Sequence, residues 1–287
     1  MQPSVARRMW LATEPYHAVV YFAPEPRAAY DGAGLRGGWM GYFASRSAAM
    51  GPVPAAVVIA TFFNFHPRMV RRAIPDAWGF AAPERVLAAR RAGVDAALRR
   101  LLGDWCGGPE AVEAADLARR AAEHCDPAGR PLHAAHADLD WPEEPHVSLW
   151  HALTLLREFR GDGHVTSLLA EGIDGCEAHI TLSSNSGMPA DVFRRARGWS
   201  EEEWAAAEDR LRARGWLRDD GIPTDAGHAV RDAVEARTDT LALAPWRHLG
   251  EEGCQRLADL LRPAVARITG GDGLPYPNPM GLPAASR

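Results

Sequence analysis

Most of this 287-residue chain shows apolar residues three and four positions apart, the periodicity of an amphipathic helix. The pattern predicts helices over Pro83–Gly103, Ala111–His124 and Thr224–Ala242. The run "AAVVIATFFNF", Ala55–Phe65, is rich in β-branched and aromatic residues, and it fits either a strand or a buried helix. The polar, proline-rich stretch Cys125–Ser148 is expected to be a connector.

The C-terminal part of the pattern predicts a helix-turn-helix. A short helix after Pro189 is followed by a turn at Gly198, and Ser200 then stands as the N-cap of a longer helix that ends near Arg214. The segment "WLRDDGIP" that comes next has the position of a short wing.

One order of short motifs occurs twice along the chain: E-P, then H-A, then R-G, then a proline followed by an apolar-Arg-Arg-Ala segment and a tryptophan. A long amphipathic helix follows in each case. We therefore predict a duplicated architecture. A first half spans residues 1–124, a connector spans 125–148, and a second half with a C-terminal helix spans 149–287.

From Pro189 onward the chain resembles the MarR-type winged-helix family of regulators. "IPTDAG" (Ile222–Gly227) stands for the signature that follows the wing, and "LGEEGCQRLADLL" (Leu249–Leu261) stands for the closing helix that serves dimerisation. The resemblance implies a mainly α fold with short β wings, here as two tandem winged-helix-like halves. It also implies a homodimer through the C-terminal helix.

The whole chain further resembles a family of actinobacterial helix-turn-helix-like proteins. The segments that carry this resemblance are "EPYHAVVYFAPE", "GYFASRSAAMGPV", "LWHALTLLREFRGDGHV" and the ending "PNPMGLP". It implies a common fold and no particular reaction.

The charge pattern argues against DNA binding. The net charge is −5, and Glu201, Glu202 and Glu203 occupy the start of the helix that would meet DNA, where each carboxylate repels phosphate. The wing carries Asp219 and Asp220. We expect a helix-turn-helix shape without a nucleic-acid face. A DNA-binding regulator of MarR type is the alternative, and it would need a basic face built from Arg194, Arg195, Arg197 and Arg210.

The basic residues exclude some chemistry. All 32 of them are arginines, so Schiff-base catalysis and lysine-dependent phosphate loops are ruled out. The four cysteines are scattered and favour buried thiols over disulfides or a zinc site.

Histidines and carboxylates recur at helical spacing in both halves. Glu14, His17 and Tyr21 share one helical face. In the second half, His151 and Glu158 fall on one stripe, and "RGDGH" is expected to be a turn that presents His164 at a helix N-terminus. His17 and His151 are expected at matching places near the starts of matching helices. Such pairs suit acid–base catalysis, so the predicted catalytic residues are His17, Glu14, His164 and Glu158.

Aromatic segments suggest an apolar pocket beside these groups. The predicted ligand-binding residues are Tyr21, His66, Trp39, Tyr42, His151, Arg157 and Asp162. Haem with a histidine ligand from the His66 segment, or a metal ion, remains an alternative occupant. The spacing His133-x-x-His136 also occurs in metal sites, although a solvated loop is the simpler interpretation.

The leading hypothesis is a small-molecule-binding protein whose site lies in a cleft between two winged-helix-like halves. The sequence leaves open whether the protein is an enzyme. A non-catalytic dimerisation module built on Leu249–Leu261 is a third alternative. No run approaches the ~20 apolar residues of a membrane span, and no signal peptide is evident, so we expect a cytoplasmic protein without a membrane partner.

Overall fold

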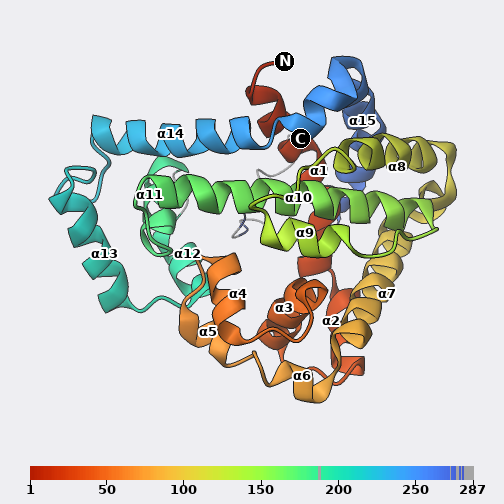
Figure 1. Ribbon diagram of the computed structural model, residues 1–287, viewed down its shortest axis with the longest axis horizontal. Coiled ribbons are helices and arrows are strands. Elements are labelled where there is room, and N and C mark those ends of the chain that lie inside the picture. Colours follow the sequence, from red (N-terminus) through yellow and green to blue (C-terminus); the bar gives the residue numbers. More distant parts are fainter. Residues whose placement is uncertain (187–188, 272, 276–277, 279, 281–287) are drawn as a thin grey trace.

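The computed structural model describes residues 1–186, 189–271, 273–275, 278 and 280, and within these residues every regular element is a helix (Figure 1). The first helices are α1 (Ser4–Phe22), α2 (Pro24–Gly32), α3 (Gly38–Ser47), α4 (Ala55–Phe62), α5 (Pro67–Arg71), α6 (Ala77–Phe80), α7 (Pro83–Leu102) and α8 (Pro109–Ala122). They are followed by α9 (Pro131–Ala137), α10 (Pro145–Ala170), α11 (Glu177–Ser186), α12 (Ala190–Arg197), α13 (Glu201–Ala213), α14 (Asp225–Leu241) and α15 (Ala244–Gly270). Two 3-10 turns lie at Ala48–Met50 and Gly103–Gly107.

Local signals set many of these helix boundaries. Helices α7 to α10 each begin at a proline, whose fixed φ suits the first helical position and whose missing N–H is not needed there. Gly198 ends α12 in the left-handed conformation (φ 78°). The Ser200 hydroxyl then accepts a hydrogen bond from the Glu203 N–H (3.1 Å), and the Glu203 carboxylate accepts one from the Ser200 N–H (2.9 Å). The predicted helix-turn-helix, α12 to α13, is therefore confirmed.

Helix α10 runs through the middle of the molecule, with α14 beside its second half and α8 beside its first (Figure 1). The main core lies on the α8 side and is built by α1, α7, α8, α10 and α15. A second core is built by the helices from α2 through α7. A third holds α11, α12 and α13 together. A smaller cluster fills the space between α10, α11 and α14.

The predicted β wings are wrong. In the described part of the chain the segment after α13 forms one isolated antiparallel bridge, between Leu217 and Pro223, and no strand. Gly221 turns the chain back (φ 77°) after only a few residues, which leaves no length for a two-stranded ribbon. The fold is mainly α, as expected, but it is not winged.

Three local expectations also change. "RGDGH" is not a turn, because α10 continues through it, and His17 lies in the last third of α1 rather than near its start. The connector holds a helix, α9, whose His133 and His136 are both buried, so these residues are not in a solvated loop. The ambiguous apolar run forms α4, a helix.

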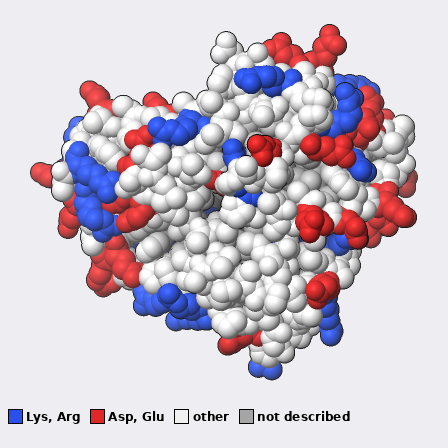
Figure 2. All heavy atoms as spheres, in the orientation of Figure 1, with Lys and Arg blue, Asp and Glu red and all other residues white. Residues whose placement is uncertain are grey.

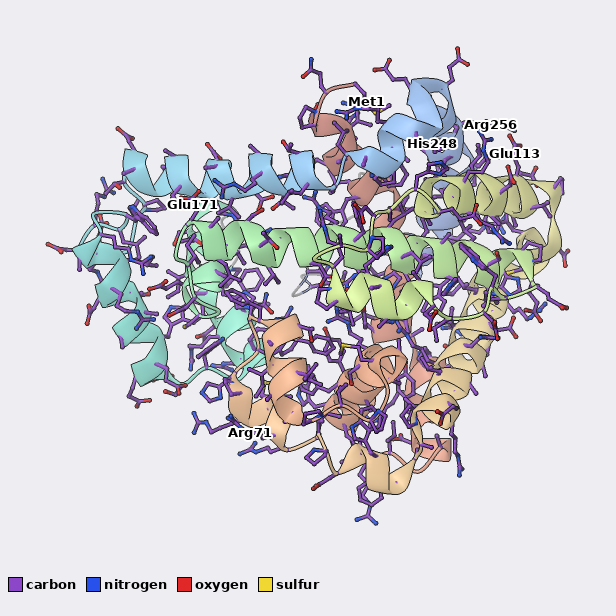
Figure 3. All side chains as sticks on the ribbon, viewed as in Figure 1. Met1, Arg71, Glu113, Glu171, His248 and Arg256 are labelled. Atoms are coloured by element: carbon purple, nitrogen blue, oxygen red, sulfur yellow. The ribbon has the colours of Figure 1, made fainter. Side chains whose placement is uncertain are left out.

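The C-terminal helix α15 packs inside the chain. Its apolar face, including Leu257, Leu261 and Ile268, joins the main core against α1 and α8. Arg256 of α15 and Glu113 of α8 add an ion pair at the surface (2.6 Å; Figure 3). A homodimer through α15 would have to use its other face, and the predicted dimer and duplicated halves stay predictions. The ending "PNPMGLP" lies mostly outside the described residues.

Among the described residues, no individual helix combines the length and the apolar composition that crossing a membrane requires. Gly38–Met50 and Ala55–Phe62, which meet at an angle of 95°, satisfy that requirement only when taken together, and only by length and composition.

Candidate functional site

A cavity of about 520 Å³ opens beside the second half of α10. Figure 2 shows a hollow near the middle of one face, with arginine and carboxylate atoms visible in and around it. We call it the arginine cavity, because six arginines line it: Arg7, Arg46, Arg157, Arg160, Arg197 and Arg231. Five carboxylates also line it: Glu14, Glu158, Asp162, Asp232 and Glu235. Its apolar wall comes from Trp10, Tyr42, Phe62, Phe63 and Phe65.

A buried chain of ion pairs forms one side of this cavity. Arg46 of α3 pairs with Glu158 of α10 (3.0 Å), and Glu158 also pairs with its neighbour Arg157 (2.9 Å). Arg157 in turn donates from Nε to Glu14 of α1 (2.9 Å). Both carboxylates are almost fully buried. The chain ties α1, α3 and α10 together around the cavity.

The two glutamates in this chain have opposite pKa shifts. Burial raises the pKa of Glu14 and outweighs the attraction of Arg157. Burial also acts to raise the pKa of Glu158, but the positive charges of Arg46 and Arg157 prevail and lower it. Neighbouring carboxylates with diverging pKa values are a common arrangement for acid–base work.

Two tyrosines stand beside the ion pairs. The Tyr42 hydroxyl accepts a hydrogen bond from Arg46 (2.8 Å). The Arg157 guanidinium lies over the Tyr21 ring, 5.3 Å from its centroid. The Tyr21 hydroxyl is buried without a hydrogen bond to a described residue, and burial raises its pKa to about 12. Tyr21 therefore stays neutral and lies one layer behind the cavity wall.

His164 presents a defined tautomer to the arginine cavity. The Thr238 hydroxyl donates to the Val234 carbonyl (2.7 Å), so it accepts from His164 Nδ1 (2.9 Å). The proton therefore sits on Nδ1, which leaves the Nε2 lone pair as an acceptor. Burial, assisted by Arg231, lowers the pKa of His164 to about 4. His164 is thus a neutral imidazole that can accept a proton.

Asp162 lines the cavity and also stabilises the fold. Its Oδ2 accepts the backbone N–H groups of Leu132 (3.1 Å) and His133 (3.0 Å) at the start of α9. Burial raises its pKa to about 6, although the hydrogen bond from His133 acts in the opposite direction. Asp162 therefore holds α9 against α10.

Six of the predicted site residues line the arginine cavity: Glu14, Tyr42, Arg157, Glu158, Asp162 and His164. The other five do not line it, and Tyr21 is one of these. His17 is fully buried and stacks on Trp150, His151 lines a separate cavity, and the exposed Trp39 packs on the buried rings of Phe43 and Phe65. His66 contacts α13, as described below.

Sequence reasoning missed five of the cavity arginines, Arg7, Arg46, Arg160, Arg197 and Arg231, and also His179. Arg46 had a readable signal, because it interrupts the otherwise small and apolar segment "GYFASRSAAMG". Arg231 of α14 and His179 of α11 reach the cavity only through tertiary packing and carry no local signal.

The described residues give no support to the metal alternative, since nowhere do three of their His, Cys, Asp or Glu side chains gather as a ligand set. His66 cannot serve as a haem ligand, because both ring nitrogens are engaged. Its Nε2 pairs with Glu203 (2.8 Å), and its Nδ1 accepts from the Arg68 N–H (3.0 Å).

The same contact covers the tip of the helix-turn-helix. Glu203, at the start of α13, binds His66 and Arg68, while the Trp199 indole N–H donates to the Asn64 carbonyl (3.2 Å). The His66 N–H donates to the Arg197 carbonyl (2.9 Å). The turn that would enter a DNA groove is therefore docked against residues 64–68 of the same chain.

The four arginines predicted for a DNA-binding face make other contacts, although Arg195, which pairs with Asp191, stays exposed. Arg194 pairs with Asp191 and Glu201, and Arg210 pairs with Glu177 (3.0 Å). Arg197 is buried at the arginine cavity, over the Phe65 ring. Carboxylates therefore neutralise most of the positive charge of this element.

No curated protein and no solved structure matches the chain. A family model described as "Helix-turn-helix family" matches residues 6–275, nearly the whole sequence. The α12–α13 unit is the element to which that description corresponds, and the match extends over the arginine cavity as well. The chain belongs to this helix-turn-helix family.

Proposed function

We propose that the protein binds a small organic anion in the arginine cavity, and that Glu14 and His164 exchange a proton with it. The observation that carries this proposal is a local surplus of guanidinium groups over the carboxylates paired with them. Arg7, Arg160 and Arg231 share two carboxylates, Glu235 and Asp239, whereas the exposed Asp232 lines the same cavity but forms an ion pair with none of the three.

Two more guanidinium groups lie on the opposite wall. Arg46 and Arg157 pair there with Glu158 and Glu14. Arg46 Nε makes no hydrogen bond to a described residue. An anionic group between these walls would meet guanidinium groups on both sides, which suit carboxylates in particular.

The aromatic side chains of the cavity wall would contact the apolar part of the ligand. Phe62 ends α4, Phe63 and Phe65 come just after it, and all three line the cavity. A ligand with an apolar ring and one anionic group would satisfy both surfaces, as small-molecule sites usually require. The neutral His164 Nε2 would then act as proton acceptor and Glu14 as proton donor.

The anionic dye 8-anilinonaphthalene-1-sulfonate has both features and can serve as the probe. We expect saturable fluorescence enhancement with the folded protein and at least tenfold weaker binding by Arg231→Met, which removes the surplus guanidinium group but leaves two arginines for two carboxylates. Arg256→Met, at the surface pair with Glu113, is the matched control and should bind like the unmodified protein. Equal binding by all three proteins would contradict the proposal.

Membership in a helix-turn-helix family favours a second candidate, a DNA-binding regulator. The docked turn and the neutralised arginines oppose it. Fluorescence anisotropy with a labelled duplex from the protein's own upstream region, at low salt, separates the two. We expect no binding, whereas salt-sensitive binding that Arg195→Ala abolishes would support the regulator.

A further inference from the structure

Arg90 occupies an unusual position for a charged residue. On α7 it falls in the stripe that includes Val86, Val94 and Ala97, all of which are fully buried. Arg90 itself is only 2% exposed. A permanent positive charge therefore lies on the side of α7 that faces the protein interior.

The hydrogen-bond partners of Arg90 are neutral. Its Nη1 donates to the Ser45 carbonyl (3.2 Å) and to His136 Nε2 (2.8 Å). His136 Nδ1 donates to the Leu132 carbonyl (2.9 Å), so its Nε2 must be the acceptor. Burial, followed by the charge of Arg90, lowers the pKa of His136 to about 3, which keeps this imidazole neutral.

No carboxylate among the described residues lies within ion-pair distance of Arg90, and its Nε and Nη2 have no hydrogen-bond partner there. Arg46 and Arg157, by contrast, both pair with Glu158. A buried charge without a counter-ion is costly, and natural proteins normally pair it. The missing partner of Arg90 is therefore to be sought outside the chain.

Arg90 lines a cavity of about 480 Å³ between α7, α9 and the first half of α10. Its guanidinium lies over the Trp150 ring, 4.9 Å from the centroid. His151 lines the same cavity and is 5% exposed, and its Nε2 is buried without a partner. Two unpartnered, buried polar groups thus belong to one cavity, which shares no lining residue with the arginine cavity.

The rim of this second cavity has the opposite charge. Glu84, Asp140 and Glu144 are exposed around it, with Arg91 as the exposed basic residue. A multiply charged anion such as phosphate would be repelled at the rim. A singly charged, largely apolar acid would pass this rim more easily.

We propose that this cavity is a second binding site, which takes the carboxylate group of a small organic acid. Arg90 Nε and Nη2 and His151 Nε2 are closed off from solvent, so a small shift of the side chains that cover them must accompany binding. The two Arg90 nitrogens then form the two-pronged donor that matches a carboxylate, and His151 Nε2 can donate a third hydrogen bond. Trp150 and Leu87 provide apolar contact for the body of the ligand.

Isothermal titration calorimetry of the full chain at pH 7 with benzoate tests this site. Benzoate also has the ring and single anionic group expected of a ligand of the arginine cavity, so Arg231→Met, which weakens that cavity, is the parent protein for these titrations. We expect benzoate to bind Arg231→Met and Arg231→Met/Arg256→Met alike, and to bind Arg231→Met/Arg90→Met at least tenfold more weakly. Arg90→Lys keeps the charge but loses the fork, so its affinity should lie between these. Inorganic phosphate should bind more weakly than benzoate in every case.

Several results would overturn the proposal. These are no benzoate binding by Arg231→Met, equal binding after Arg90→Met is added to it, an equal loss when Arg256→Met is added instead, or a preference for phosphate. Benzoate binding by the unmodified protein that disappears in Arg231→Met would assign benzoate to the arginine cavity instead. Should Arg90→Met fail to fold, His151→Phe keeps the ring contact with Trp141, and several-fold weaker benzoate binding is expected from it.

Discussion

Individual arginines in this protein are buried in two different ways. Arg46 and Arg157 lie in a chain of ion pairs with Glu158 and Glu14, where each charge is offset by its neighbours. Arg90 is more deeply buried than either and donates hydrogen bonds only to neutral acceptors. The first arrangement organises a cavity wall, and the second leaves hydrogen-bond donors unused.

The buried ion pairs make a prediction about Glu158. Glu158→Gln leaves Arg46 without a carboxylate and Arg157 with only Glu14, so the free energy of unfolding should fall by roughly 3–5 kcal/mol. Denaturation with urea, followed by circular dichroism, measures this loss. Asp31→Asn removes an exposed i,i+4 partner of Arg27 and should change stability little. A loss of similar size in both variants would show that burial does not strengthen the pair.

The sequence predicted which side of a helix a residue occupies better than its position along the helix axis. The stripe through His151 and Glu158 does lie on one side of α10, but seven residues separate them by about 10 Å along the helix. His151 therefore reaches the second cavity and Glu158 the arginine cavity. His17 shares the α1 segment with Glu14 but faces Trp150 in the core, which helical spacing alone does not determine.

Among the elements, the helix-turn-helix was predictable because its signals are local. A glycine that ends α12 and a serine that caps α13 act within a few residues of themselves. The missing wing and the uninterrupted α10 depend on packing instead. Gly163 is tolerated in mid-helix because Arg130 occupies the space beside it, and no pattern in the sequence announces that contact.

The two glycines of α10 should respond oppositely to alanine. A Cβ at Gly163 would lie 2.4 Å from Arg130 Nη1, whose guanidinium also binds the carbonyls of Phe159 and Leu241. Gly163→Ala should therefore cost about 1–3 kcal/mol. At Gly161 the nearest atom is 3.6 Å away, and Ala should stabilise the helix by about 0.5–1 kcal/mol. Thermal unfolding of both variants measures the difference, and stabilisation by Gly163→Ala would refute the packing argument.

For the whole molecule, the all-helical core joins segments from both ends of the chain, since α1 and α15 pack together with α8 and α10. The presence of helices could be predicted from the periodicity of the apolar residues. The partners of each helix, and hence the two cavities, arise from contacts between residues far apart in the sequence, 143 positions for Arg157 with Glu14 and 46 for Arg90 with His136.

Buried histidines give the molecule a pH dependence. The pKa values of His136, His151 and His164 are lowered to about 3, 4 and 4 by burial, against about 6.5 in the unfolded chain. The unfolded state thus binds more protons, so stability is complete above pH 6.5 and declines as pH falls toward 4. Each histidine contributes a slope of up to roughly 1.4 kcal/mol per pH unit. Asp162, with its pKa raised to about 6, offsets part of this decline.

Urea titrations between pH 7 and pH 4.5 test this expectation. The free energy of unfolding should drop steadily, and the double variant His136→Asn/His164→Asn should show a shallower decline. His228→Asn, on the exposed side of α14, is the control. A stability that stays constant or rises toward pH 4.5 would mean that these imidazoles are charged in the folded protein.

Helix α10 also sets a limit on how the sequence can change in length. Val147, Trp150 and Thr154 line one cavity, and Glu158, Gly161 and Val165 line the other, so a single strip of helix surface serves both. One inserted or deleted residue between Thr154 and Arg157 would rotate everything beyond it by about 100°. That rotation would move Glu158 away from Arg46, so the two halves of α10 must keep the same helical phase.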